Sequence, residues 1–183
     1  MLPSAPIIVP GTPGGPNRTV TAVPTSQATV DPDDVKFLRD MMVHHQQAVQ
    51  MTELARTRAT NASVKSLAER IRVGQKPEIN AMRVLLTERG QQPPDLSQSH
   101  HADHVGMPGM ASPAQLADLE KASGAAFDKL FLELMIKHHE GAVAMGYTAV
   151  ESGSDLRVNE LAQEVNITQT KEILTMRKLQ TQL

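Results

Sequence analysis

"FLRDMMVHHQQAVQM", residues 37–51, and "FLELMIKHHEGAVAM", residues 131–145, are two copies of one pattern, and they decide the fold. A shift of 94 residues aligns 37–86 with 131–180 without a gap, and 18 of the 50 aligned pairs are identical. Each copy carries two adjacent histidines between methionines. Identity at this level over one fixed offset indicates an internal repeat, so both copies should fold into the same unit.

Each copy of the repeat has the pattern of two helices joined by a short turn. Its apolar residues recur at helical spacing, and Gly, Asn and Asp interrupt the pattern near the middle of each copy. The sequence predicts first helices that begin at Asp31–Pro32 and near Ser112–Pro113, turns at 57–63 and 151–155, and second helices over about 63–89 and 155–182. Pro77 lies inside the second helix of copy one, so we expect a kink there or a break after Val73.

A single helical hairpin cannot bury both of its apolar stripes, whereas two hairpins packed together can. We therefore expect an all-α fold, a four-helix bundle built from two repeated hairpins with pseudo-twofold symmetry. The expected boundaries are a flexible, disordered, Pro/Gly/Thr-rich tether at 1–30 and a bundle at 31–183, divided into repeat one (33–90), a His/Met-rich linker (91–111) and repeat two (112–183).

The composition limits the class of protein. The 183 residues include 10 Met but no Cys and no Trp, and the net charge is −2. The lack of Cys excludes disulfides, thiolate metal sites and a Cys nucleophile, and the charge makes nucleic acid a poor partner. No apolar stretch is long enough to cross a membrane, and no phosphate-binding loop, dinucleotide motif or Ser/His/Asp order is present.

The first 30 residues are rich in Pro, Gly, Thr and Ser. This composition is typical of a flexible spacer that follows a removed signal peptide or a lipid anchor. The segment itself lacks the basic start and apolar stretch of a signal peptide. We therefore expect an extracytoplasmic protein (secreted, periplasmic or lipid-anchored), with a disordered terminus on a cytosolic protein as the alternative.

The candidate site residues share one face of each helix. At about 100° per residue, both His pairs fall on the apolar side, which should face the bundle interior. On the first helices these residues are Met41, His44, His45 and Met51, with their equivalents Met135, His138, His139 and Met145. On the second helices they are the i,i+4 neighbours Glu78 and Met82, with their equivalents Glu172 and Met176. The interior could hold four imidazoles, six thioethers and two carboxylates.

Two interpretations of this set stay open. A methionine stripe is often core filler, because thioethers fill irregular gaps. Four buried imidazoles need partners for their ring nitrogens, and Glu78 and Glu172 can supply them in a purely structural His–Glu network. The other interpretation is that the His pairs bind a metal ion, which the presence of two adjacent histidines in both copies favours.

Thioether and imidazole groups together form a soft ligand set, which favours copper, above all Cu(I), over magnesium, calcium or manganese. Zinc is disfavoured because it seldom binds Met and no Cys is present. A di-iron centre would take Glu-x-x-His motifs from two helices. The sequence has no such motif, although Glu78 and Glu172 lie where carboxylates could sit. Iron is thus the alternative metal.

The linker adds a second group of candidate ligands. Within 11 residues of polar chain it contains His100, His101, His104, Met107 and Met110. Such a segment can wrap a metal ion, because metal–ligand bonds offset the entropy lost on ordering. A solvated polar loop with a chance His-rich tract is the alternative interpretation, and the methionines favour copper.

Both cassettes resemble the signature of the bacterial domain of unknown function 305 family, roughly F-x-x-x-M-x-x-H-H-x-x-A-x-x-M-A. The resemblance covers residues 33–183. It implies a ferritin-like four-helix bundle, mostly in exported or lipid-anchored proteins, some of which look like copper-binding proteins of the cell envelope, and it points to the His and Met residues of the two cassettes. Departures are Gln47, where the family often has Gly as at Gly141, and Thr52 and Gly146, where Ala is common. These departures could make the two half-sites unequal.

The leading hypothesis is a non-catalytic, extracytoplasmic protein that buffers or delivers copper through its His/Met clusters, with residues 100–110 as a capture arm. A ferritin-like metallo-oxidase that uses iron or copper is the second hypothesis. The third is a metal-free structural or interaction bundle. A metal ion is the expected partner, and the sequence leaves open a homo-oligomer and a copper-delivery partner.

Overall fold

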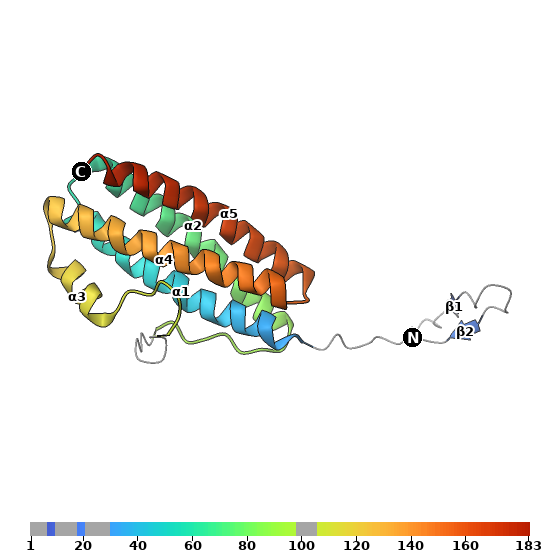
Figure 1. Ribbon diagram of the computed structural model, residues 1–183. Coiled ribbons are helices and arrows are strands. Elements are labelled where there is room, and N and C mark those ends of the chain that lie inside the picture. Colours follow the sequence, from blue (N-terminus) through green and yellow to red (C-terminus); the bar gives the residue numbers. More distant parts are fainter. Residues whose placement is uncertain (1–6, 10–17, 21–29, 98–105) are drawn as a thin grey trace.

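The computed structural model describes residues 7–9, 18–20, 30–97 and 106–183 (Figure 1). Within these residues lie the helices α1 (Pro32–Arg58), α2 (Ala62–Glu88), α3 (Pro113–Lys121), α4 (Gly124–Ser152) and α5 (Leu156–Gln180), and the antiparallel strands β1 (Ile7–Val9) and β2 (Arg18–Val20). The four long helices form one bundle, which confirms the all-α prediction. The two short strands have no counterpart in the sequence prediction. None of the described helices is both long and apolar enough to cross a membrane.

Side-chain caps fix where the helices of each hairpin begin. Asp31 caps α1 by accepting a hydrogen bond from the Asp33 N–H. Asn61 caps α2 and Asp155 caps α5, and each of these two side chains accepts from two backbone N–H groups. Asn61 and Asp155 are equivalent positions of the repeat. Both second helices therefore start by the same mechanism.

Repeat two begins differently from the sequence prediction. Ser112 does cap a helix, through a capping box with Gln115, but this helix is the short α3, which ends at Ala122. The long helix α4 starts at Gly124, whose φ of +64° suits glycine. The prediction of one long helix from the Ser112 cap is therefore wrong, because extended backbone around Ser123 interrupts it.

The break predicted near Pro77 does not occur, because α2 continues through this residue. Pro77 lies on the exposed face of α2, as does Val73, whose carbonyl loses its helical N–H partner. Water can bond to that carbonyl, so the cost of continuing the helix is small. Ile71 and Ile79 on the opposite face are buried and keep α2 packed in the bundle.

A reciprocal pair of aspartates holds the two hairpins together. Asp34, at the start of α1, accepts from the backbone N–H groups of 154–155 in the turn between α4 and α5, at 3.1 and 2.8 Å. Asp128, its equivalent at the start of α4, accepts from the N–H groups of 60–61 between α1 and α2. Both carboxylates are buried. The start of the first helix in each hairpin thus binds the turn of the other hairpin. The helices α1 and α4 therefore run antiparallel.

The connection between the hairpins runs the length of the bundle. Just after α2 ends, Arg89 pairs with Asp155 at the start of α5, whereas α4 starts at the other end, beside the turn at 60–61. The described parts of the intervening chain, 90–97 and 106–123, therefore lie along the bundle on the side of α1 and α4 (Figure 1). Arg39 on α1 donates to the Gln92 carbonyl in this linker. One long crossover between parallel helices, here α2 and α4, also connects the helices of ferritin-like bundles.

Candidate metal centre

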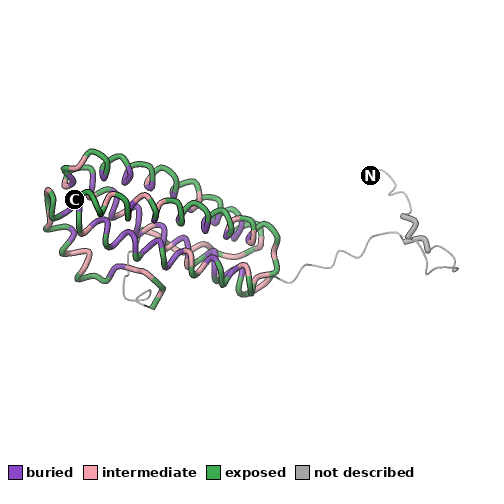
Figure 2. The backbone as a smooth tube through the Cα atoms, turned by 45° about the horizontal axis from the view of Figure 1, so that its top comes forward, coloured by how far each residue is buried: buried purple, intermediate pink, exposed green. Residues whose placement is uncertain are grey.

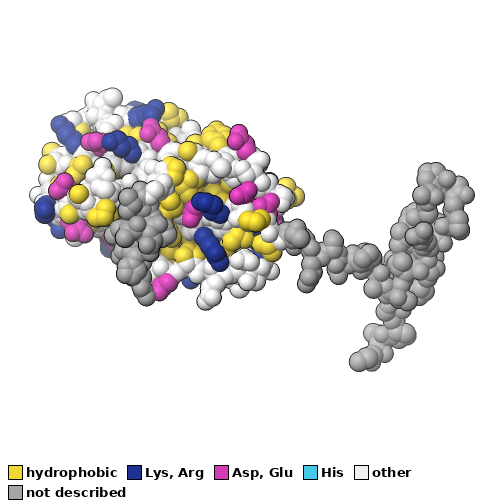
Figure 3. All heavy atoms as spheres, turned by 60° about the horizontal axis from the view of Figure 1, so that its bottom comes forward, with side chains coloured by type: hydrophobic (Ala, Val, Ile, Leu, Met, Phe, Trp, Pro, Cys, Tyr) yellow, Lys and Arg dark blue, Asp and Glu magenta, His cyan; other side chains and the backbone are white. Residues whose placement is uncertain are grey.

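The four histidines of the repeat meet at the centre of the bundle. His44 and His45 lie midway along α1, His138 and His139 lie midway along α4, and none of the four has exposed surface. Because α1 and α4 run antiparallel, equivalent residues face each other, and the ring centroids of His44 and His138 are 3.8 Å apart. On the face shown in Figure 3, none of the visible described side chains is a histidine.

The second histidine of each pair bonds to a glutamate on the neighbouring helix. His45 Nε2 lies 2.7 Å from Glu78 Oε2, between α1 and α2. His139 Nε2 lies 2.9 Å from Glu172 Oε2, between α4 and α5. The histidines are fully buried, whereas the two glutamate side chains are partly exposed. Each hairpin thus carries the same His–Glu pair at the same place in the repeat.

The hydrogen bonds assign the tautomers of three rings. Carboxylate and carbonyl oxygens accept, so Nε2 of His45 and of His139 donates to the glutamate. For the same reason, His44 Nε2 donates to the Pro108 carbonyl oxygen at 3.0 Å. The Nδ1 atom of each of these rings is buried without a hydrogen-bond partner. Neither ring nitrogen of His138 has a partner, so five buried ring nitrogens in the described residues are unpartnered.

Burial keeps the central pair of histidines uncharged. Loss of solvent around His44, followed by repulsion from His45, lowers its pKa to about 3. Loss of solvent, and then repulsion from His44, lowers the pKa of His138 well below its usual value. The nearby His44 backbone opposes this shift in His138, although no hydrogen bond of good geometry forms. Both rings are neutral at neutral pH, so their nitrogens can bind a metal ion without first losing a proton.

The methionines form two trios within the two clusters of the buried core, which Figure 2 shows as the purple inner faces of the long helices. The first trio consists of Met51, Met135 and Met176. The second consists of Met41 and Met82 with Met145, which is partly buried against the same cluster; this cluster also contains Met42, whose equivalent in the repeat is Ile136. The repeat offset converts one trio into the other. Each trio draws on both hairpins, because antiparallel α1 and α4 place the first Met of one cassette near the second Met of the other.

A segment of the linker covers one side of the histidine cluster. We define residues 106–111 as the strap. Gln47 on α1 binds the strap through Ala111, donating to its carbonyl at 2.9 Å and accepting from its N–H at 2.8 Å. Pro108 in the strap provides the carbonyl to which His44 donates. The strap is therefore attached to repeat one by two side chains of the cassette.

The strap meets repeat two through backbone contacts. A Cβ atom on Gly141 of α4 would lie 2.0 Å from the Pro108 oxygen and 2.7 Å from the Gly109 Cα. Gly109 itself has a φ of +78° and sits against the carbonyl of Lys137. Only glycine at position 141 permits this approach. The Gln47/Gly141 difference between the cassettes thus has a physical reason, since one residue bonds the strap and the other makes room for it.

The remaining predicted ligands are placed less centrally. His100, His101 and His104 lie outside the described residues. Met107 and Met110 belong to the strap and are partly buried, and Met107 lines a surface pocket together with Met145. Among residues 30–97 and 106–183, no three His, Asp or Glu side chains are grouped so as to hold a metal ion.

Several residues of the centre have no role in the sequence prediction. Asp34 and Asp128 are equivalent positions of the repeat and both are Asp. This identity, which could have marked them, lies just outside the aligned stretch. Gln75 and Gln169, also identical, are buried, and the side-chain oxygen of each has no hydrogen-bond partner. The carbonyl of Pro108 has no sequence signal, because any residue supplies a carbonyl.

The comparisons with known proteins agree with this architecture. The family model of the domain of unknown function DUF305 matches residues 34–180. The chain belongs to the DUF305 family. A DUF305 fragment from Deinococcus radiodurans is 34% identical, with a TM-score of 0.74 over 84% of this chain and 99% of that one. A DUF305 protein from Streptomyces coelicolor, assigned as secreted, is 33% identical, with a TM-score of 0.72 over 80% of this chain and 91% of that one.

The protein CopM is also similar to this DUF305 chain. CopM solved in a Cu(II)-bound form is 28% identical, with a TM-score of 0.70 over 81% of this chain and 96% of that one. CopM has also been solved in a Cu(I)-bound form and in an apo form. No curated protein matches the chain.

The other departures from the DUF305 pattern also have packing reasons. A Cβ atom on Gly146 would lie 2.1 Å from Oδ1 of Asn166, so alanine there would displace a buried amide. Thr52, the equivalent residue in repeat one, donates its hydroxyl to the Val49 carbonyl at 2.7 Å. The two DUF305 cassettes therefore share their histidines and differ in how the surrounding residues pack.

Proposed function

We propose that the protein binds copper, as Cu(I), in the interior of the bundle. The observation that carries this proposal is the state of the histidine rings. Three of them donate Nε2–H to an oxygen and leave Nδ1 buried without a partner, and His138 has both ring nitrogens free. Metal-binding histidines typically have this arrangement, because the oxygen partner fixes the tautomer and orients the free nitrogen. Buried unpartnered nitrogens cost free energy in the metal-free protein, and a bound ion removes that cost.

The glutamates have an orienting role in this proposal. Glu78 and Glu172 each accept a hydrogen bond from a histidine, so we assign them to positioning, in place of the direct ligation considered from the sequence. The histidines of the cassettes supply nitrogen ligands, fewer than three to any one ion, because no three His, Asp or Glu side chains in the described residues are grouped to hold one. The two methionine trios, each of which combines residues of both hairpins in the buried core, supply thioether sulfur.

The donor set favours a soft ion of low charge. Neutral imidazole nitrogens and thioethers suit Cu(I), whereas hard divalent ions prefer oxygen. A dry interior penalises each additional charge, which also favours a monovalent ion. The similarity to CopM, solved in Cu(I)-bound and Cu(II)-bound forms, supports copper over iron.

We assign the protein a binding role, as a buffer or carrier of copper outside the cytoplasm. The similarity to the Streptomyces coelicolor protein that is assigned as secreted supports this compartment. The Pro/Gly/Thr-rich composition of residues 1–30 is that of a spacer between an export signal or anchor and a folded domain.

A competitive titration with a chromophoric Cu(I) chelator under anaerobic, reducing conditions tests the proposal. The double variant Glu78→Gln with Glu172→Gln keeps the side-chain shape and removes the charge. It should bind Cu(I) about 10- to 100-fold more weakly, because a neutral amide is a weaker acceptor than a carboxylate and its NH2 group can bond to the ring in the other tautomer. The double variant His44→Ala with His138→Ala should lose most of the binding, and the wild type should bind Cu(I) more tightly than Zn(II).

Met42→Ile is the matched control. Met42 is fully buried on α1, but repeat two has Ile136 at the equivalent position, so the shared site does not need this thioether. Its Cu(I) affinity should equal that of the wild type. Circular dichroism establishes that each variant is folded. If both double variants are folded and bind Cu(I) as tightly as the wild type, the His–Glu pairs are a structural network and the proposal is wrong.

A further inference from the structure

The two methionine trios are equivalent in sequence but differ in their access to solvent. Met51 and Met145 are the corresponding second methionines of the two cassettes. Met51 has no exposed surface, whereas Met145 is only partly buried. Because the repeat makes the inner surroundings of these residues alike, the difference must come from what lies outside them.

Helix α3 covers the Met51 side. A hollow of about 320 Å³ remains between α1 and α3, lined by Met51 together with Leu54 and Leu116. No other methionine lines this hollow, and its one carboxylate is that of Glu120. Met51 of the first trio is thus covered by α3 and has no exposed surface, although it lines this hollow.

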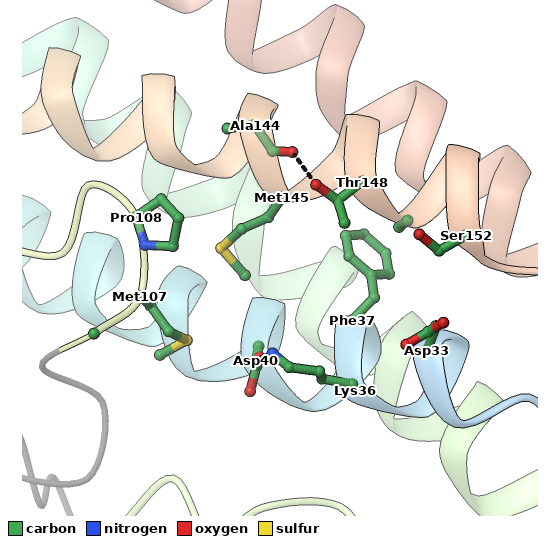
Figure 4. Close-up of a pocket in the computed structure, with 12 residues that line it drawn as sticks. Asp33, Lys36, Phe37, Asp40, Met107, Pro108, Ala144, Met145, Thr148 and Ser152 are labelled. Carbon is green, nitrogen blue, oxygen red and sulfur yellow. Dashed lines mark hydrogen bonds and ion pairs between the residues drawn. The ribbon is translucent and has the colours of Figure 1, made fainter.

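The Met145 side opens into a pocket of about 380 Å³ between α1, α4 and the strap. Figure 4 shows the side chains of Met107, from the strap, and Met145, from α4, extending into the space between these elements. The charged residues of the wall are Asp33, Asp40 and Lys36, which pairs with Asp40, so the lining carries a net charge of −1. Two thioethers and an excess negative charge make this wall suited to a soft cation.

The pocket leads directly to the buried trio. Met145 lines the pocket and also packs against the core cluster that contains Met41 and Met82. Met145 therefore borders both the pocket and the core cluster that holds the buried thioethers, and it connects the two. The close contact between Gly109 and Gly141 holds the strap, and with it Met107, against α4.

We infer that soft monovalent cations enter the bundle from one side only, through this pocket, with the thioethers of Met107 and Met145 as the first docking site. This inference rests on the proposed copper binding and adds the route by which the ion reaches the interior. On the other side α3 packs over the equivalent Met51, which has no exposed surface, and no second thioether lines the hollow there.

The test measures the rate at which the full-length protein takes Cu(I) from a chromophoric chelator, with the final absorbance as a measure of the equilibrium. Met145→Leu and Met51→Leu form a matched pair, because each removes one thioether from equivalent places in the repeat. Met145→Leu should slow the initial uptake about tenfold, a rise in barrier of about 1.4 kcal/mol, whereas Met51→Leu, which removes an interior thioether away from the pocket, should slow it far less. Met107→Leu, outside the bundle core, should slow uptake by a larger factor than it weakens the equilibrium binding.

The outcomes separate this inference from the proposal on which it rests. If the wild type takes up Cu(I) and all three variants do so at the wild-type rate, the route is wrong and the interior site stands. Equal slowing by Met51→Leu and Met145→Leu also overturns the one-sided route. If the wild type takes up no Cu(I), the proposed function and the route both fail.

Discussion

The hairpins α1–α2 and α4–α5 share the contacts that make the fold and differ in the contacts that cover the site. In both, a buried aspartate at the start of the first helix binds the turn of the other hairpin, and a histidine bonds to a glutamate of the second helix. The strap touches them differently, since Gln47 bonds to it and Gly141 makes room for it. A single linker cannot contact two equivalent surfaces in the same way. The contacts in the core are therefore the same in both hairpins, whereas the contacts with the linker differ between them.

The reciprocal aspartates should be the most costly residues to remove from this symmetric part. Asp128 accepts from two backbone N–H groups and from the Thr60 hydroxyl, and Asp34 accepts from two N–H groups. Asp128→Ala leaves these buried or partly buried donors unpaired, and we expect it to lower the free energy of unfolding by about 3 kcal/mol. Asp34→Ala should cost nearly as much. Urea denaturation monitored by circular dichroism measures both losses.

Two controls sharpen this prediction. Asp118→Ala removes an exposed carboxylate from α3 and should change the free energy of unfolding by less than about 0.5 kcal/mol. Asp128→Asn keeps one acceptor oxygen and should fall between the alanine variant and the wild type. A loss at Asp34 far smaller than at Asp128 would show that the two hairpins do not depend equally on each other.

The asymmetric part of the comparison is tested at Gly141. Gly141→Ala places a methyl group 2.0 Å from the Pro108 oxygen, so the strap must move away from α4. We expect a loss of about 2 kcal/mol in the free energy of unfolding, because the neighbour is backbone and cannot rotate aside. Urea denaturation again measures the effect.

Gly74→Ala is the control for Gly141→Ala. Gly74 is also a helical glycine, but nothing lies within 4 Å of its added Cβ. Alanine there should stabilise the protein by about 0.5 to 1 kcal/mol through its higher helix propensity. If both glycine variants stabilise the protein, the strap does not rest on α4 as described.

The bundle could be predicted from the sequence because the sequence patterns that specify it are periodic. The fixed offset of the repeat and the helical spacing of apolar residues together specify two hairpins with buried inner faces. The start of α4 was missed because the Ser112 cap identifies the start of a helix without identifying which helix. The alternative of a break after Val73 was wrong, because a proline on an exposed face leaves the unpaired carbonyl to water and α2 continues.

The candidate site was predictable to the extent that it consists of side chains. The inward face of the cassettes follows from helical spacing, and Glu78 and Glu172 were identified as possible histidine partners. The close approach of the His44 and His138 rings depends on how α1 crosses α4, which the pattern of one helix does not contain. The contact with the Pro108 carbonyl depends on the path of a linker without periodicity. Sequence patterns therefore identify the side chains of the site. They do not identify the tautomers of the histidines or the linker segment that covers them.

The smallest predicted effect concerns acid and the central histidine pair. The pKa of His44 is about 3 in the folded protein, because burial disfavours the charged ring, and near 6.5 in the unfolded chain. Between these values the unfolded state binds the proton that the folded state excludes, so the stability of the metal-free protein is complete above about pH 6.5 and falls as the pH is lowered. From about pH 7.5 to about pH 5.5 this residue alone should lower the free energy of unfolding by about 1.4 kcal/mol.

Urea denaturation, repeated across this pH range with a chelator present, measures how the free energy of unfolding depends on pH. Variants of His44 and of His138 separate the contributions of the two residues. His44→Gln and His138→Gln each remove one ring whose pKa is lowered by burial, so each should flatten the dependence on pH. Only His44 has an oxygen partner, in the strap, and this contact partly offsets the penalty on its charged form. His138→Gln should therefore flatten the curve at least as much as His44→Gln. The opposite order would mean that the unpartnered ring takes up its proton more readily in the folded bundle, which contradicts the buried, uncharged centre on which copper binding is proposed.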